Sequence, residues 1–292
     1  MKIVHIIGGL GNQMFQYALL IALRGRFGQE IKADISSFKN YGLHNGYELQ
    51  KVFGITPSLA SRQDLSKLTY YAPSYAIQRV VRKLLPHRKT ECIESKRGDY
   101  IATVLTDPSD KYYEGYWQNY KYFDKYYPKI CEEFSFKTDN LNADNQELVS
   151  SILSFPSNYV SIHIRRGDYI KNTRFGGLCD ISYYQSAIEE VKRINNNKNI
   201  HFLIFSNDME WCRLNLESTY GKYIYVDWNK GSTSYIDMYL MTLCGTNIIA
   251  NSSFSWWGAY LNRNQEKVVI APKKWTNDVV AFNRQLPDWI LL

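Results

Sequence analysis

The sequence predicts an α/β fold in which parallel β-sheets are covered by helices. Two observations support this. The first 35 residues read as strand, turn, helix and strand, and the second half holds five apolar runs of strand length separated by longer segments. Strands that alternate with helical segments are typical of βαβ units and a parallel sheet.

The N-terminal segment has the pattern of one βαβ unit. The apolar run KIVHII predicts a strand over residues 2–7, and GGLG at 8–11 predicts a turn. Residues 12–28 have helical spacing, with Gly28 as the expected end of the helix. EIKADI, residues 30–35, predicts the second strand.

The middle of the chain gives a weaker pattern. It contains a basic helix candidate, residues 74–89, and a tyrosine-dense stretch, residues 111–128. The proline-containing segment 151–159 has turn residues and marks a boundary. We therefore expect two domains, residues 1–155 and 156–292, each long enough to bury a core.

The second half of the chain alternates regularly. Five apolar runs predict strands, and connecting segments such as 233–244 and 253–264 have helix length. This pattern predicts a doubly wound parallel sheet. The five runs are residues 159–164, 199–205, 222–227, 246–250 and 267–271.

Polar residues follow each of these five predicted strands at its carboxyl end. They are RRGD at 165–168, SND at 206–208, DWN at 227–229, NSS at 251–253 and PKK at 272–274. In an open α/β sheet the carboxyl ends share one edge, and the ligand crevice lies there. We therefore expect one ligand site built from these separated segments.

The chemistry of these segments predicts a diphosphate site. Arg165 and Arg166 each offer a planar set of donors that matches phosphate oxygens. Asn251, Ser252 and Ser253 lie where a strand turns into a helix, so hydroxyls and backbone N–H groups would face an anion. The alternative is that the arginines are ordinary surface residues and the serines cap a helix.

Other motifs give weaker indications. Asp208 and Asp227 could accept hydrogen bonds from a ribose or a base edge. GGLGN resembles a dinucleotide fingerprint, but Met14 stands where a third glycine is needed, which disfavours NAD binding. The sequence contains no HxH, HExxH or DxD, and arginines can neutralise phosphates in place of Mg²⁺, so we expect no metal.

Composition narrows the class of protein without choosing a function. The formal charge of +7 suits a phosphate-bearing ligand, nucleic acid or an anionic membrane surface. Five cysteines without a CxxC pair argue against a disulfide framework and a zinc site, and favour a reducing cytoplasm. No apolar run reaches the length of a membrane span.

Taken together, the motifs resemble the α-1,2-fucosyltransferases of glycosyltransferase family 11. The matching stretches are GGLGNQMFQYA (8–18), GYWQNYKYF (115–123), HIRRGDY (163–169), FSND with WC (205–212) and NSSFSWWGAYLN (251–262). They span nearly the whole chain. The resemblance implies a GT-B-like fold, two Rossmann-like domains facing across a cleft, with the acceptor side in residues 1–155 and GDP-β-L-fucose bound by residues 156–292.

The resemblance also implies the reaction. It would be an inverting, metal-independent transfer of L-fucose to the 2-hydroxyl of a terminal galactose on a glycan, without a cofactor, as in O-antigen biosynthesis. The expected location is the bacterial cytoplasm, with peripheral contact at the inner membrane as an option. No nucleic acid partner is expected for such an enzyme.

Site residues follow from the same resemblance. Arg165 would lie on the β-phosphate of the departing GDP, with Arg166 and His163 shaping its pocket. The rest of the donor site would comprise Ser206, Asn207, Asp208, Asp227, Asn251, Ser252, Ser253 and Phe254, while Gly9, Gly11, Asn12 and Gln13 would reach toward the transferred sugar.

An inverting transfer needs a base on the acceptor hydroxyl. Asp168 is the first candidate because it follows the arginines, and His44 and Asp34 are reserves. The alternative for Asp168 is that it pairs with an arginine and orients it.

Two further segments allow two interpretations each. Aromatic residues of the tyrosine-dense stretch could stack on acceptor sugars or pack in the core: Tyr113, Tyr116, Trp117 and Tyr120. Basic residues of the helix candidate could dock on anionic lipid or form a solvated face: Arg79, Arg82, Lys83, His87, Arg88 and Lys89.

Three other functions remain open at this point. One is a glycosyltransferase with another nucleotide-sugar donor or linkage. A nucleic-acid-binding protein would also explain the positive charge and the aromatic residues. A carbohydrate-binding module is the third, although it has no use for arginines at the carboxyl edge of a sheet.

Overall fold

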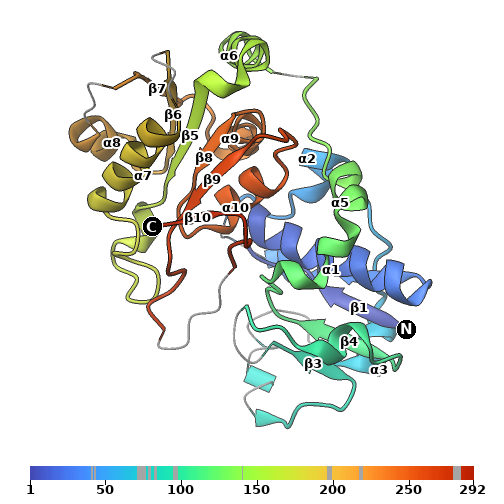
Figure 1. The fold of residues 1–292 in the computed structure, drawn as a ribbon. Helices are drawn as coiled ribbons and strands as arrows, with labels where there is room; N and C mark the ends of the chain where they lie inside the picture. Colours follow the sequence, from blue (N-terminus) through green and yellow to red (C-terminus); the bar gives the residue numbers. More distant parts are fainter. Residues whose placement is uncertain are drawn as a thin grey trace. The chain divides into compact units, whose positions relative to one another are not determined.

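A computed structural model describes two compact units, Met1–Lys137 and Thr138–Leu292, each with its own parallel sheet (Figure 1). The boundary lies earlier than the predicted 155/156. The reason is that α6 (Ala143–Ser154) buries Leu148 and Ile152 in a core of the second unit. The described residues are 1–40, 42, 44–70, 77, 80–81, 84–94, 98–139, 141–195, 199–216, 220–278 and 284–292.

The first unit contains a four-stranded sheet in the order β2-β1-β4-β3, with parallel neighbours throughout. The predicted βαβ opening is confirmed. The strands are β1 (Lys2–His5), β2 (Ile31–Asp34), β3 (Glu91–Ile93) and β4 (Lys111–Glu114), and the helices are α1 (Leu10–Phe27), α2 (Leu49–Phe53), α3 (Arg62–Leu68) and α5 (Tyr127–Glu133).

Two glycines shape the first connection. Gly8, with φ of 92°, lets the chain turn from β1 into α1, a backbone conformation that other residues rarely adopt. Gly28, with φ of 62°, ends α1 as expected, and its N–H donates to the carbonyl of Arg24.

The tyrosine-dense stretch supplies β4 and part of the core. Tyr113 is 1% exposed and Trp117 is completely buried, and their rings meet edge to face. The packing interpretation is therefore confirmed for these two residues. Tyr116 and Tyr120 are half-buried.

The basic helix candidate is described only in part. Its residues Arg79, Arg82 and Lys83 lie outside the described residues. Arg88 is described, and its guanidinium donates to carbonyl oxygens of the α3 region, including that of Ser66.

The second unit contains a six-stranded sheet in the order β10-β9-β8-β5-β6-β7, again parallel. All five predicted strands are present. They are β5 (Tyr159–Ile164), β6 (His201–Ser206), β7 (Lys222–Tyr225), β8 (Thr246–Ile248) and β9 (Val268–Ala271), to which β10 (Ile290–Leu291) is added. The helices beside α6 are α7 (Ile181–Ile194), α8 (Met209–Asn215), α9 (Tyr235–Met241) and α10 (Ser253–Tyr260).

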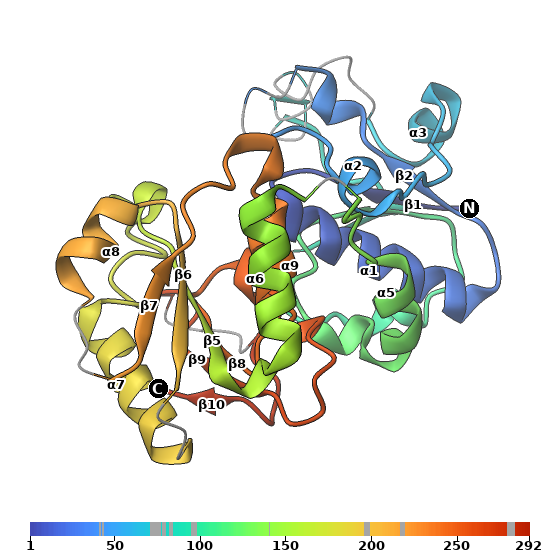
Figure 2. The ribbon, with the colours of Figure 1, turned by 90° about the horizontal axis from the view of Figure 1, so that it is seen from above.

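Helices cover both faces of this sheet, as the doubly wound pattern predicts (Figures 1 and 2). On one face Val160 and Ile162 of β5 pack with α7 and α8. On the other face Leu203 and Phe205 of β6 pack with α6 and α9. Burial on both faces explains why these strands read as continuous apolar runs. Among the described helices, none is long and apolar enough to cross a membrane.

Candidate functional site

The candidate site lies at the carboxyl edge of the six-stranded sheet, between β5 and β8. The chain leaves β5 toward β6 and β7, and then returns to place β8 on the other side of β5. Connections therefore diverge from this point, and open α/β sheets bind ligands in the crevice that results. The segments after β5, β6 and β8 all carry residues predicted for the site.

The two arginines after β5 are held by different partners. Nη2 of Arg165 lies 2.8 Å from a carboxylate oxygen of Asp168, and its guanidinium lies 5.5 Å from the Tyr169 ring centroid. Nε of Arg166 lies 3.2 Å from Oδ2 of Asp208. The two side chains are 29% and 27% exposed, so each guanidinium is oriented by a carboxylate while solvent still reaches it.

The segment after β6 fixes Arg166 further. Oδ1 of Asn207 accepts from the backbone N–H of Arg166 at 2.9 Å. Asp208 caps α8 through the N–H of Trp211, whose ring lies 4.1 Å from the guanidinium of Arg166. Oγ of Ser206 accepts from the N–H of Asp208 at 2.9 Å. The structure thus brings the predicted residues Ser206, Asn207 and Asp208 together with the arginines.

Asp168 and Asn207 also meet. Nδ2 of Asn207 lies 3.5 Å from Oδ1 of Asp168, whose side chain is 56% exposed. Gly167 lies against the same amide, and a Cβ atom at this position would overlap Nδ2 of Asn207. Asp168 therefore contacts Arg165, as its orienting interpretation requires, and Asn207 as well.

Asn251, three residues after the end of β8, is buried, and its side chain bonds with other parts of the protein. Its Nδ2 donates to the carbonyls of Phe175 and Trp275 at 3.0 and 3.2 Å, and its Oδ1 accepts from the thiol of Cys179 at 3.6 Å. Its own carbonyl accepts from Tyr169 at 3.4 Å. The side chain thereby joins its own segment to the loops that hold Phe175 and Trp275. Its contact with a diphosphate stays a prediction.

The serines after β8 open α10. Oγ of Ser252 accepts from the N–H of Phe254 at 3.3 Å, so the N-cap interpretation is confirmed for Ser252. Ser253 is the first residue of the helix, and Phe254 lies with its ring 5.6 Å from that of His163.

His163, on β5, is a buried imidazole. Its Nδ1 lies 2.8 Å from Oγ of Ser255, and its carbonyl accepts from Tyr184. Burial, aided by the positive charge of Arg165, lowers the pKa of His163 to about 3. The ring is therefore neutral at physiological pH. Sequence reasoning missed Ser255, although it stands inside the FSWWG segment.

Asp227 and Asn229, at the two ends of the DWN segment after β7, have different partners. Asp227 pairs with the exposed Arg213 at 2.7 Å. Asn229 turns inward and donates to Asp237 at 2.8 Å, and desolvation raises the pKa of the Asp237 carboxyl to about 8. The partners described for Asp227 thus do not include Arg165 or Arg166.

The remaining predicted residues belong to the first unit. Gln13 is fully buried, and its amide bonds with the backbone of Gly8, Gly46 and Glu48. Asn12 accepts from Gln118 at 2.7 Å. Gly9 is the N-cap of α1, and Gly11 lies within its first turn.

The two reserve bases differ in accessibility. Asp34 is 4% exposed and accepts from Tyr112 and from the N–H of Ser36. His44 is exposed, and a Cβ atom placed at Gly9 would lie 3.4 Å from its ring.

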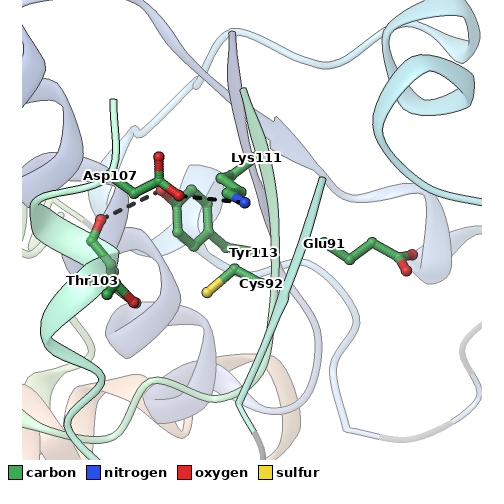
Figure 3. A pocket seen from close by; sticks show the side chains of 7 residues that line it. Glu91, Cys92, Thr103, Asp107, Lys111 and Tyr113 are labelled. Carbon is green, nitrogen blue, oxygen red and sulfur yellow. Dashed lines mark hydrogen bonds and ion pairs between the residues drawn. The ribbon is translucent and has the colours of Figure 1, made fainter. Parts of the chain in front are cut away.

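The first unit also has a pocket of about 200 Å³ (Figure 3). It lies beside the start of β4, and Lys111 pairs there with Asp107 at 3.3 Å. Its lining residues are Glu91, Cys92, Thr103, Val104, Asp107, Lys111 and Tyr113. None of them was predicted as a catalytic or donor-binding residue. Among the described residues, no three His, Cys, Asp or Glu side chains group as metal ligands.

Comparisons with known proteins identify relatives along the whole chain. The chain is 34% identical to the Alpha-1,2-colitosyltransferase of Escherichia coli, over 99% of this chain and 97% of that protein. It is 31% identical to the O-antigen biosynthesis glycosyltransferase WbnK of Escherichia coli, over 98% of each. Galactoside alpha-(1,2)-fucosyltransferase 1 of Ateles belzebuth is 27% identical over 87% of this chain and 63% of that protein.

A solved structure supports the fold. The chain matches the crystal structure of NodZ alpha-1,6-fucosyltransferase soaked with GDP-fucose with a TM-score of 0.50 and 13% identity, over 89% of this chain and 91% of that one. This likeness confirms the predicted GT-B-like α/β fold class, while the cleft between the two domains stays a prediction.

The family model described as Glycosyl transferase family 11 matches residues 95–292. That range includes four of the five motifs from which the resemblance was inferred. Given this match and the two bacterial relatives that align along nearly the whole chain, the protein belongs to glycosyl transferase family 11 and is a glycosyltransferase.

Proposed function

We propose that this enzyme transfers L-fucose from GDP-β-L-fucose to the 2-hydroxyl of a terminal galactose on a glycan, with inversion and without a metal. Support for the linkage comes from the relatives, two of which are named as α-1,2 transferases. The family model supports sugar transfer as the reaction class.

The observation that carries the proposal is the pair of arginines after β5. Each guanidinium is fixed by a carboxylate and about one quarter exposed at the switch point of the sheet. Breaking the bond between fucose C1 and the phosphate oxygen leaves growing negative charge on GDP. An arginine whose guanidinium is already held in position before the reaction stabilises that charge most in the transition state. Arg165 and Arg166 take this role in the proposal, with His163, Ser206, Asn207 and Asp208 holding the pocket.

Ser253 and Phe254, at the start of α10, complete the diphosphate site in this proposal. The backbone N–H groups of a helix N-terminus favour an anion. Ser252 and Asn251 stabilise this site in the proposal. Ser252 caps α10, and the Asn251 side chain holds the loops of Phe175 and Trp275 together. Asp227 is assigned to the nucleoside end of the donor.

Asp168 has two possible functions in an inverting transfer. It can accept the proton of the acceptor hydroxyl, or it can hold Arg165 in place for the leaving group. Its exposed carboxylate suits the first function and its ion pair with Arg165 suits the second. The arginines neutralise the diphosphate in either case, which is why the proposal needs no Mg²⁺.

One observation favours an alternative donor sugar. The relative with 34% identity is named for colitose, which is L-fucose without its 3-hydroxyl. GDP-colitose is therefore the competing donor. A site that bonds the 3-hydroxyl would reject colitose strongly, whereas a site without such a bond would accept both sugars.

The first unit is assigned to the acceptor. Gly9, Gly11, Asn12 and Gln13 would form its sugar-facing segment, and a lipid-linked glycan in the bacterial cytoplasm is the proposed acceptor. All five cysteines are free thiols, which fits a reducing compartment.

Calorimetric titration tests the donor site. GDP, GDP-fucose, GDP-colitose, GDP-mannose and UDP-galactose are titrated in EDTA into the native enzyme, into Arg165→Ala and into Arg193→Ala. Arg193 is an exposed arginine of α7 that pairs with Glu190, so it serves as the matched control. We expect metal-free binding of the guanine nucleotides that only Arg165→Ala weakens.

Two results would overturn parts of the proposal. If no guanine nucleotide binds, the donor assignment is wrong. If binding requires a divalent cation, the metal-independent mechanism is wrong. Product linkage is then read by NMR on a galactose-terminated acceptor, where a bond to any hydroxyl other than the second contradicts the proposed specificity.

A further inference from the structure

The first sheet has a switch point of its own, between β1 and β4. The chain leaves β1 toward β2, and it later places β4 on the other side of β1. Open α/β sheets bind ligands at such a point, outside the carboxyl ends of the strands. The last residues of these two strands are His5 and Glu114, and neither belongs to the candidate donor site.

Three side chains are connected by hydrogen bonds at this point. Nδ1 of His5 lies 2.8 Å from Oε2 of Glu114, and Nε2 of His5 lies 2.8 Å from Oγ of Ser37. In the sheet, Val4 pairs with Tyr113, so His5 and Glu114 are neighbours at the next position of the same register. The imidazole is therefore held at both of its nitrogens.

The three side chains differ in their exposure to solvent. His5 is 1% exposed and Ser37 is 6% exposed, whereas the side chain of Glu114 is 19% exposed. Because an ionised carboxylate only accepts hydrogen bonds, Nδ1 of His5 is the donor to Glu114. The buried imidazole thus orients a carboxylate that solvent, and therefore a ligand, can reach.

The other described carboxylates at this edge of the sheet suit a ligand less well. Asp34, which ends β2, is only 4% exposed. Glu94, which follows β3, accepts from the backbone N–H groups of Gly98 and Tyr116 at 2.8 and 2.7 Å. It therefore holds the local backbone in place. Glu114 is the carboxylate of these strand ends whose position fits ligand binding best.

The backbone that follows Glu114 is constrained. A Cβ atom at Gly115 would lie 2.5 Å from Cβ of Glu94, so only glycine fits at this position without a shift. Trp117 has a φ of 53°, which a bulky side chain rarely adopts. Backbone strain of this kind clusters at ligand sites, where the surrounding structure maintains it.

We propose that Glu114 binds a hydroxyl group of the terminal galactose other than the 2-hydroxyl, and that His5 and Ser37 are positioning residues for its carboxylate. The inference rests on the proposed function, which assigns the acceptor to the first unit. A carboxylate that accepts from a sugar hydroxyl forms a charge-assisted hydrogen bond. A site built around such a bond rejects an analogue that lacks the hydroxyl. Glu114 is therefore a residue that determines acceptor specificity.

Transfer to deoxygenated acceptors provides the test. The acceptors are methyl β-D-galactoside and its 3-, 4- and 6-deoxy derivatives, each assayed with the native enzyme, Glu114→Gln and Glu132→Gln. Glu132 is an exposed residue of α5 that pairs with Lys129, so it serves as the matched control. For one of the three hydroxyls, we expect its removal to lower kcat/KM by about 10- to 100-fold in the native enzyme and the control. The same removal should cost less than about threefold in Glu114→Gln, because the two changes delete one interaction.

The kinetic constants of the variants separate binding from chemistry. Glu114→Gln should raise the acceptor KM by about tenfold with kcat nearly unchanged, since the hydrogen bond is made alike in the ground state and the transition state. The KM for GDP-fucose should not change. His5→Leu, which cannot donate to the carboxylate, should also raise the acceptor KM. His5→Asn, whose amide can still donate to Glu114, should bring it back toward the native value.

Three results would count against the inference. Equal losses in the native enzyme and Glu114→Gln for every deoxy acceptor would overturn it. A lower kcat with an unchanged acceptor KM would also overturn it, because Glu114 would then act in the chemical step and not in binding. If the native enzyme transfers fucose to none of the galactosides, the proposed function is wrong and this inference fails with it.

Discussion

Arg165 and Asp168 form an ion pair across three residues of the turn that follows β5, with 2.8 Å between Nη2 and Oδ1. The same carboxylate oxygen lies 3.5 Å from the amide of Asn207, on the turn that follows β6. One oxygen thus connects the ends of two neighbouring strands. The guanidinium of Arg165 is thereby placed before any substrate arrives, which is the condition for electrostatic stabilisation of a leaving group.

The first prediction concerns turnover of the Arg165→Ala variant. Because Arg165 would stabilise charge that develops only as GDP leaves, we expect kcat to fall by about 10² to 10³, or about 3 to 4 kcal/mol of transition-state stabilisation. Steady-state kinetics at saturating GDP-fucose measures this, with Arg193→Ala as the control. A kcat near that of the native enzyme would remove Arg165 from the mechanism.

The second prediction separates the two functions of Asp168. Asn at this position can still accept a hydrogen bond from Arg165 but cannot take a proton. If Asp168 orients Arg165, we expect Asp168→Asn to lower kcat by about tenfold, since a charged hydrogen bond becomes a neutral one. The pH profile of kcat should keep its shape. Loss of about 10³ or more, together with disappearance of the acidic limb of that profile, would instead identify Asp168 as the base.

The sequence predicted the second sheet well and the first sheet poorly, for a physical reason. Strands such as β5 and β6 are buried on both faces, so they read as long apolar runs. By contrast, β3 of the first sheet has three residues that are only half-buried, and β10, the strand of the second sheet that was not predicted, has two, so neither gives a recognisable apolar run. The domain boundary was misplaced because α6, which begins before the proline-containing segment 151–159 and ends within it, packs against the second sheet.

The residues of the candidate site were also predictable only in part. Arg165, Arg166 and Asp208 were predicted because strand ends share an edge in any parallel sheet. The partners of Asn251, in contrast, come from loops around Phe175 and Trp275, whose paths no local pattern encodes. Ion pairs such as that of Asp227 with Arg213 are likewise set by tertiary structure.

The third prediction tests Asn251 as a support of the site. Asn251→Ala would leave the carbonyls of Phe175 and Trp275 without their buried donor, so we expect about 1 to 3 kcal/mol less stability in urea unfolding. The affinity for GDP should fall as the loops loosen. Cys179→Ala, which removes only a weak thiol donor to Oδ1, is the control and should have little effect. Native stability together with lost GDP affinity would show instead that Asn251 touches the ligand.

The fourth prediction follows from the buried imidazole of His163. Its pKa is about 3 in the folded protein against 6.5 for an ordinary histidine, because burial and the charge of Arg165 disfavour the protonated ring. Between these two values the unfolded chain binds a proton that the folded chain does not. Stability must therefore fall as the pH drops below about 6.5, by at most about 1.4 kcal/mol per pH unit, and it is unaffected by this residue above that pH.

Substitution of His163 by Asn removes this titration, because the amide side chain does not ionise between pH 5 and pH 7 and can still bond with Ser255. Urea unfolding at pH 7 and pH 5 measures the effect, with the exposed His87→Asn as the matched control. Between these pH values we expect the native protein and the control to lose up to about 2 kcal/mol more stability than His163→Asn, since the carboxylates common to all three titrate alike. Equal losses in all three proteins would mean that His163 takes up its proton while folded, and the neutral ring assigned to the donor pocket would then be wrong.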